Sequence, residues 1–237
     1  MAHQDEYALL HAFFGDSPHG IFVDVGANDP FQGSTSWPLE QVGWSGILIE
    51  PIPHLAKRLT ESRTSRVFNC ACSSRENASK TKTLHVHSVN PGWSSFHKDE
   101  SPWLGDDFQE IQVDVRTLDE VLEEAEIPAG FDLLAMDVEF HEVSVLEGLD
   151  LARWKPRLIF VEDHAYDHNL LRYLRSHDYK FFKRSCMNSW FVPSDSPLTP
   201  SFSDRWAFFR KYYLGFPFRR LKRRLAPLRR AFREWRK

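Results

Sequence analysis

The chain has 237 residues, of which 42% are hydrophobic, 14% aromatic and 27% charged. This length suits one α/β domain with an appendage, and the apolar content excludes wholesale disorder. Apolar runs reach only about four residues, far short of the roughly 20 that cross a bilayer, and no secretory signal is visible. Three cysteines, Cys70, Cys72 and Cys186, are too few for a disulfide framework, so we expect a soluble, cytoplasmic protein.

Positive charge is concentrated at the C-terminal end of the chain. Residues 205–237 contain thirteen Lys or Arg and one acid, Glu234, which leaves 17 of the 30 bases and 32 of the 33 acids in the rest of the chain. An acidic body with a basic tail indicates a polyanionic partner for the tail, either nucleic acid or an anionic membrane surface.

Hydrophobic periodicity and turn residues predict alternating helices and strands. Helices are expected over 5–15, 35–42, 54–62, 117–127, 141–149 and 167–176, the fourth opened by a capping box from Thr117 to Glu120. Strands are expected over 21–25, 46–51, 66–70, 111–115, 131–137, 157–162, 179–184 and 189–192. This order predicts an α/β fold with a doubly wound, mostly parallel sheet that closes in a hairpin.

We expect three regions: a domain over 1–193, a Pro- and Ser-rich linker over 194–204, and the basic tail over 205–237. Within the domain, 73–108 is polar and long for a loop, with one further strand over 83–89. Loops of this length are often lids or substrate-binding excursions. Its aromatic residues Trp93, Phe96 and Trp103 either stack on a sugar or pack beneath the loop as a satellite core.

Carboxylates follow most of the predicted strands. In an open parallel sheet, ligands bind beyond the carboxyl ends of the strands. The residues at those positions are Asp24–Asn28, Glu50, Asn69–Ala71, Asp137–Glu139 and Glu162–His164, and four of these five stretches contain an acid. We therefore expect the functional site at this edge of the sheet.

The first of these turns argues against a dinucleotide. It has a single glycine, Gly26, and is flanked by Asp24 and Asp29, whereas a pyrophosphate-binding turn has several glycines and no acids nearby. A cationic cofactor without phosphate, of which S-adenosylmethionine is the obvious case, suits these residues. Glu50, 26 residues after Asp24, is then placed to accept hydrogen bonds from the ribose hydroxyls.

Several segments resemble the FkbM family of S-adenosylmethionine-dependent methyltransferases. They are FVDVGANDP at 22–30, GWSGILIEP at 43–51, DVEFHEVSVLEG at 137–148, PRLIFVEDH at 156–164 and NSWFVP at 188–193. The resemblance implies a class I methyltransferase (Rossmann-like) fold and O-methylation of a sugar or natural-product hydroxyl. It further implies a cofactor site in which the methionine side is lined by Asp24, Gly26, Ala27 and Asn28, the ribose is held by Glu50, and the adenine lies near Asn69, Cys70 and Ala71.

One residue departs from the family pattern. The family usually has Asp-x-Glu-Gly-x-Glu, and Phe140 stands at the position of that glycine here. A bulky ring where the backbone should pass closely would reshape the acceptor pocket.

Three residues are predicted to act on the acceptor. Methyl transfer to a hydroxyl needs an in-line nucleophile whose proton is removed as the new bond forms. Asp137 and Glu139 point to one side of a strand end, and His164 has the chemistry of a general base near neutral pH, with His141 as its competitor. A divalent cation held by Asp137, Glu139, Glu162, Asp163 and His164 is the alternative means of activating the hydroxyl.

The basic tail carries an apolar stripe at helical spacing. Its members, three or four residues apart, are Leu214, Phe218, Leu221, Leu225, Leu228, Phe232 and Trp235, preceded by the aromatic residues Trp206, Phe208, Phe209, Tyr212 and Tyr213. A basic face opposite such an apolar face is typical of a helix in an anionic membrane interface. Self-association, docking on the acidic body and nucleic-acid binding are the alternatives.

These observations predict an S-adenosylmethionine-dependent O-methyltransferase. Its acceptor would be a glycan or lipid-linked saccharide of lipopolysaccharide or exopolysaccharide type. Residues 205–237 would attach it peripherally to the inner face of the cytoplasmic membrane. Two other functions stay open: a nucleic-acid methyltransferase guided by the tail, which the acidic body disfavours, and a non-catalytic scaffold, which the intact set of acidic residues disfavours.

Overall fold

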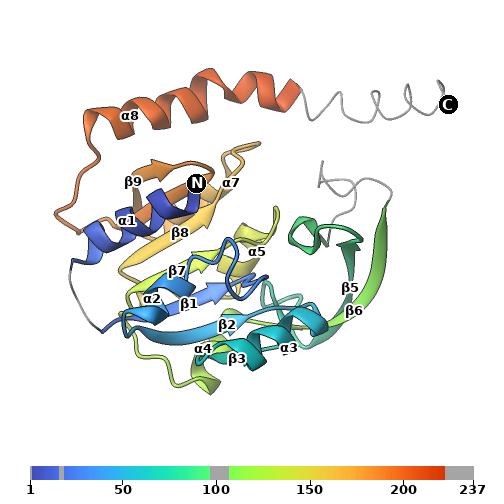
Figure 1. Ribbon diagram of the computed structural model, residues 1–237. Coiled ribbons are helices and arrows are strands. Elements are labelled where there is room, and N and C mark those ends of the chain that lie inside the picture. Colours follow the sequence, from blue (N-terminus) through green and yellow to red (C-terminus); the bar gives the residue numbers. More distant parts are fainter. Residues whose placement is uncertain (1, 16–18, 97–106, 222–237) are drawn as a thin grey trace.

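The computed structural model describes residues 2–15, 19–96 and 107–221, with side chains from Tyr7 onward. Its centre is a seven-stranded sheet in the order β3-β2-β1-β7-β8-β10-β9 (Figure 1). In chain order these strands are β1 (Ile21–Val25), β2 (Ser45–Ile49), β3 (Arg66–Phe68), β7 (Leu133–Met136), β8 (Leu158–Glu162), β9 (Tyr179–Ser185) and β10 (Asn188–Pro193). Neighbouring strands are parallel except β10, which is antiparallel to both β8 and β9.

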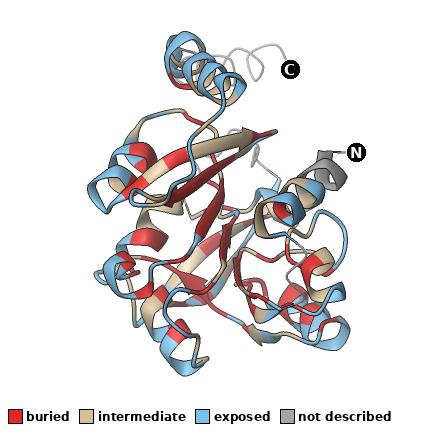
Figure 2. Cartoon of the chain, turned by 90° about the vertical axis from the view of Figure 1, so that its left-hand side faces the viewer, coloured by how far each residue is buried: buried red, intermediate tan, exposed pale blue. Residues whose placement is uncertain are grey.

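Helices cover both faces of this sheet. They are α1 (Ala2–Phe14), α2 (Trp37–Gln41), α3 (Pro53–Ser62), α4 (Leu118–Glu124), α5 (Glu142–Glu147), α6 (Leu151–Trp154) and α7 (Asn169–Ser176). Side chains alternate along each strand, so Phe22 of β1 packs in the cluster that holds Leu10 of α1, while Val23 packs in the cluster that holds Leu146 of α5. The buried residues follow the sheet through the middle of the molecule (Figure 2).

The predicted doubly wound, mostly parallel sheet with a closing hairpin is confirmed. The capping box is also present: Thr117 Oγ1 accepts from the backbone N–H of Glu120 at 3.1 Å, and Glu120 Oε2 accepts from that of Thr117 at 2.9 Å. These two features depend on local pattern, which is why sequence alone finds them.

The long polar segment is more ordered than a loop. Together with the residues on either side of it, this segment forms a second, three-stranded sheet in the order β4-β6-β5. The strands are β4 (Ala71–Cys72), β5 (Lys80–His87) and β6 (Phe108–Arg116). The 3₁₀ helix Pro91–Trp93 follows β5. Its inner face packs on α3, with Leu84 and Val113 in one cluster with Leu55. This small sheet therefore stands beside the carboxyl ends of β1, β2 and β7. Trp103 lies outside the described residues.

The C-terminal helices lie along the β9 side of the molecule (Figure 1). Helix α8 (Phe202–Phe209) continues through a π-helical turn at Arg210–Leu214, and the chain is helical again over 216–221. A capping box between Ser201 and Asp204 starts α8 inside the predicted linker. Tyr212, predicted in the aromatic patch of the tail, is instead 1% exposed. The predicted stripe residues Leu225, Leu228, Phe232 and Trp235 lie outside the described residues.

Among the described helices, none combines the length and the apolar character that crossing a membrane requires.

Candidate active site

The turn after β1 passes directly against the end of β7. Gly26 has a φ of +85°, and a Cβ added to it would lie 1.9 Å from the carbonyl oxygen of Asp137. Only glycine fits here, because both the backbone conformation and the close approach exclude a side chain. Two residues later Asn28 is also left-handed, at a φ of +52°, a conformation that asparagine tolerates better than most residues.

Glu50, directly after β2, is locked to this turn. Its Oε2 accepts a hydrogen bond from the backbone N–H of Asn28, and its Oε1 accepts one from that of Ile52, both at 2.9 Å. The side chain is buried, and burial raises the pKa of Glu50 from 4.5 to about 7 in spite of these two donors. Each oxygen keeps a second lone pair, so the carboxylate can accept further hydrogen bonds from a ligand.

A cavity of about 80 Å³ opens between this carboxylate and the small sheet. Of the residues predicted to bind a cofactor, Gly26, Asn28, Glu50, Cys70 and Ala71 line it. The opposite wall is made by the segment after β5, including Gly92, Ser95 and Phe96. Ala27 does not line the cavity, because it is buried on the other face of the sheet with Phe22 and Leu39. Asn69 does not line the cavity either. Its amide donates to the backbone oxygens of Glu50 and Pro51 and thus stabilises the backbone that follows β2.

A second cavity, of about 320 Å³, adjoins the first. The two share Asn28, Gly92, Asp137 and Glu139 as walls, and the second also contains Asp24, Trp93 and Glu162. Small-molecule sites usually have about 300–1,000 Å³, so the first cavity alone is too small for a nucleoside cofactor.

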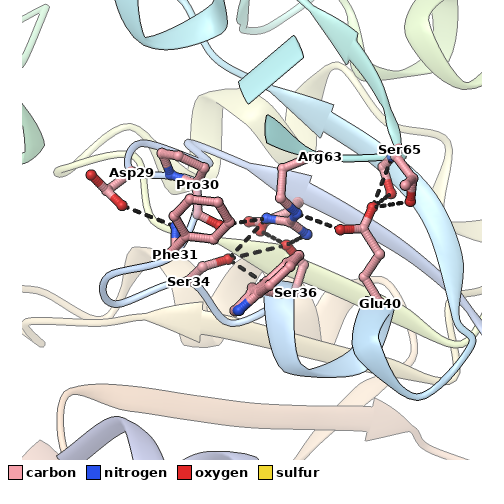
Figure 3. A network of polar contacts seen from close by, with 11 residues as sticks. Asp29, Pro30, Phe31, Ser34, Ser36, Glu40, Arg63 and Ser65 are labelled. Atoms are coloured by element: carbon pink, nitrogen blue, oxygen red, sulfur yellow. Dashed lines mark hydrogen bonds and ion pairs between the residues drawn. The ribbon is translucent and has the colours of Figure 1, made fainter. Parts of the chain in front are cut away.

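A buried polar network around Arg63 and Ser36 (Figure 3) fixes the side chain of Asp24. Ser36 Oγ donates to Asp24 Oδ2 at 2.5 Å, and Arg63 donates to Ser36 Oγ at 3.1 Å and to Glu40 Oε2 at 2.5 Å. The Arg63 side chain is fully buried. Burial raises the pKa of Asp24, although Ser36 and Arg63 act in the opposite direction. The network fixes the loop between β1 and α2, and with it one wall of the second cavity.

Acidic side chains crowd the floor of the second cavity. Asp137 follows β7 and Glu162 ends β8, and burial together with Glu162 and Glu139 raises the pKa of Asp137 well above its ordinary value. Glu142 accepts from the backbone N–H of Phe140 at 3.0 Å, and burial raises its pKa to about 8. Glu142 is the last acid of the Asp-x-Glu-x-x-Glu pattern and was not among the predicted site residues; it lies beside these acids and lines neither cavity.

His164 completes this cluster from the end of β8. Its Nε2 lies 3.7 Å from Glu139 Oε2. Burial acts to lower the pKa of His164, but Glu139 and the neighbouring Glu162 more than offset this, and the pKa is raised. His141 faces a different way: its Nε2 is 2.9 Å from Ser73 Oγ, and it lines the first cavity.

Phe140 covers the outer side of His164. The two rings are stacked with centroids 4.7 Å apart. Phe140 has a φ of +73°, directly after Glu139 at +46°. The glycine that the family usually has at this position suits such a backbone, whereas phenylalanine adopts it at a cost of about 1–2 kcal/mol. The substitution thus preserves the turn and places a ring against His164.

The predicted metal ligands fall into two groups. Glu139, Glu162 and His164 each offer one ligand atom, and these atoms all lie within 4.8 Å of one another. Asp137 and Asp163 are not in this group. The Asp163 carboxylate instead accepts from the Tyr212 hydroxyl and, at 2.6 Å, from the backbone N–H of Ala165. Alternation along β8 separates Asp163 from its two neighbours.

The strand order, with an antiparallel strand inserted next to the edge and acids after β1, β2 and β7, defines the class I methyltransferase fold. The FkbM methyltransferase domain matches residues 24–181. The chain belongs to the FkbM methyltransferase family.

Among solved structures, the chain is similar to the FkbM methyltransferase of Methylobacillus flagellatus, with 17% sequence identity and a TM-score of 0.43. The similarity covers 74% of this chain and 44% of that one, so the chain spans less than half the length of that protein. No curated protein matches the chain.

Proposed function

We propose that the protein transfers a methyl group from S-adenosylmethionine to a hydroxyl of a glycan or lipid-linked saccharide. The observation that carries this proposal is the pair of adjoining cavities that share Asn28, Gly92, Asp137 and Glu139. The first offers Glu50 to the ribose hydroxyls of a nucleoside. The second offers acids to a cationic sulfonium and to an acceptor hydroxyl. Cofactor and acceptor can therefore meet at the shared wall.

The transfer needs little covalent chemistry from the protein. The carbon–sulfur bond of the sulfonium breaks as the acceptor oxygen bonds to the methyl carbon, and the products are a methyl ether, S-adenosylhomocysteine and a proton. The Glu139–His164 pair, 3.7 Å apart, is placed to take that proton. Holding the hydroxyl in line supplies the rest of the acceleration.

A divalent cation is a second means of activating the hydroxyl at the same place. Glu139, Glu162 and His164 would hold it, and it would lower the pKa of a bound hydroxyl while neutralising the crowded acids. Titration with Mn²⁺, followed by its electron paramagnetic resonance signal, tests this arrangement directly. Loss of tight binding in Glu162→Gln is expected, and an unchanged free Mn²⁺ signal in the presence of wild type would exclude the ion.

The test of the cofactor is calorimetric titration with S-adenosylhomocysteine. We expect binding to the wild type and at least ~10-fold weaker binding to Glu50→Gln, because two hydrogen bonds to a buried carboxylate are lost. Glu61→Gln is the matched control, since Glu61 lies exposed on α3. Absence of binding to the wild type would reject the cofactor. The acceptor is tested by mass spectrometry of glycans from cells with and without the gene, where one additional methyl group is expected.

We further propose that the C-terminal helices bring the enzyme to an anionic membrane surface. Phe202, Trp206 and Phe218 are 87%, 53% and 75% exposed, and basic residues lie between them. Co-sedimentation with anionic liposomes should be strong for the full chain and weaker for a chain ending at Leu221, which removes most of the basic residues but keeps the docked Tyr212. Equal partitioning of both chains would contradict a role for 222–237.

A further inference from the structure

A third hollow, of about 570 Å³, lies between the turn that joins β9 to β10 and the C-terminal helices. Four of the residues that line it are cations: Arg184, Arg210, Lys211 and Arg219. No acidic residue is among the described residues that line it. The hollow is therefore a basic site on a body that is otherwise acidic.

The positive charge of this hollow is only partly balanced. Arg184 lies 3.8 Å from Asp163 Oδ2, and this buried carboxylate also accepts from the Tyr212 hydroxyl. Arg219 is positioned by backbone oxygens, those of Ala165 and Lys211. Among the described residues, the Arg184–Asp163 pair is the only ion pair that involves one of the four cations of the hollow, so positive charge is in excess around it.

Lys211 is the cation that this excess affects most. Burial and the neighbouring Arg184 lower the pKa of Lys211 to about 8. Asp163 and Glu162 act in the opposite direction but do not cancel these effects. A bound anion would add to their contribution, because a nearby negative charge favours the charged form of a lysine. Oxyanions such as phosphate are the usual ligands of a clustered set of Arg and Lys donors.

Two further observations relate the hollow to the acceptor. Cys186, in the β9–β10 turn, lines both this hollow and the second cavity, so the two spaces meet at that residue. Apolar side chains also line the hollow, among them Leu214 and Phe218, which are 48% and 75% exposed. A ligand that occupies both spaces would therefore contact acidic residues in the second cavity, and cations and apolar side chains in the hollow.

We propose that this hollow binds a phosphate group carried by the acceptor, with an apolar arm of that phosphate along Leu214 and Phe218. The proposal deepens the proposed function and rests on it only for the sugar end of the acceptor. The methylated hydroxyl would belong to the part of the acceptor that lies inside the second cavity. The chemical class is thus a saccharide linked through phosphate to an apolar group.

The test uses the full chain without S-adenosylmethionine. Calorimetric titrations with inorganic phosphate and with octyl phosphate, below its micelle-forming concentration, should show binding of both, with octyl phosphate at least ~10-fold tighter, since its chain buries apolar surface. Lys211→Met should weaken both at least ~10-fold. The control is Lys57→Met, at an exposed lysine on α3, and thermal unfolding should show both variants folded.

Each outcome has a distinct meaning. Equal affinity for the two phosphates would overturn the apolar arm, and binding that Lys211→Met leaves unchanged would overturn the hollow as the site. Arg210→Gln gives a second check that does not involve a buried group, with a weaker affinity expected. Because S-adenosylhomocysteine binding is measured separately, a failure of the methyltransferase proposal would leave the phosphate result standing, and the reverse also holds.

Discussion

Gly26 and Asp137 are in direct backbone contact, although 110 residues separate them in the chain. A Cβ on Gly26 would lie 1.9 Å from the Asp137 carbonyl oxygen, and the backbone N–H of Asp137 donates to Val25 O at 3.0 Å. The turn after β1, which lines the first cavity, and the end of β7, which lines both cavities, are therefore joined directly. A change at either position is transmitted to the other.

The first prediction concerns this contact. Gly26→Ala should lower the free energy of unfolding by at least ~2 kcal/mol more than Gly130→Ala, because overpacking adds to the strain of a positive φ. Gly130 is the matched control, since its φ is +78° and a Cβ there meets nothing within 4 Å. Urea unfolding of both variants measures the difference. Equal losses would mean that the close approach to Asp137 does not exist.

The second prediction concerns the pH dependence of stability. The folded-state pKa of Glu50, about 7, lies above its ordinary value of 4.5, so folded Glu50 binds its proton more tightly than unfolded Glu50. The resulting stabilisation is fully present below pH 4.5 and is lost as the pH rises to about 7. Glu50→Gln should remove this slope, so that the wild type loses up to ~3 kcal/mol more stability than the variant as the pH rises from 5 to 8. Urea unfolding at pH 5 and pH 8 measures this difference. If the free energies of unfolding of the wild type and of Glu50→Gln changed equally with pH, the raised pKa would be contradicted.

A third prediction tests the left-handed turn at Phe140. Phe140→Gly and Phe140→Ala both remove the ring from His164, but only glycine relieves the positive φ. The glycine variant should therefore be about 1 kcal/mol more stable than the alanine variant. At positions with a negative φ the order is normally reversed, and the glycine variant is the less stable one. Thermal unfolding ranks them, and a more stable alanine variant would be inconsistent with the turn described.

The fourth prediction concerns the docking of the C-terminal helices. Tyr212→Phe removes the hydroxyl that donates to buried Asp163, which should cost about 1–3 kcal/mol. Tyr213→Phe is the control, because Tyr213 is the next residue and is 52% exposed. Equal unfolding midpoints for the two variants would show that Tyr212 does not reach the core. The same contact decides where the chain is shortened in the membrane-binding test. A chain ending before residue 204 would lose Tyr212 and would not separate membrane binding from docking of the helices, whereas a chain ending at Leu221 keeps Tyr212.

Much of the frame was predictable from the sequence because it depends on local signals. β-branched runs with an acid at or next to their end predicted β1, β2 and β8, and the carboxyl ends of parallel strands had to meet at one edge. The separation of Asp163 from Glu162 and His164 was also within reach, because alternation along a strand already divides them. The prediction grouped these three by proximity in the chain and so placed Asp163 with the wrong neighbours.

The rest required tertiary information. β5 corresponds to the strand expected over 83–89, but it starts at Lys80. Its pairing with β6 in a sheet separate from the main one is not visible in a polar stretch in which only Leu84 and Val86 are buried. Tyr212 looked like part of an exposed aromatic patch, and only the fold shows that Asp163, 49 residues earlier, is its partner. The third hollow was equally hidden, because its cations come from a hairpin and from helices that meet only in space.

The small sheet leaves and rejoins the main body at a single place. Ala71 of β4 pairs with Val115 of β6, and Ser73 N–H donates to Arg116 O at 3.0 Å. The segment between them begins and ends at neighbouring points, pairs mainly with itself through β5 and β6, and supplies the outer wall of both cavities. Replacing this segment would therefore change the outer walls of both cavities, while β2 and β7, which end just before Glu50 and Asp137, keep their places in the main sheet.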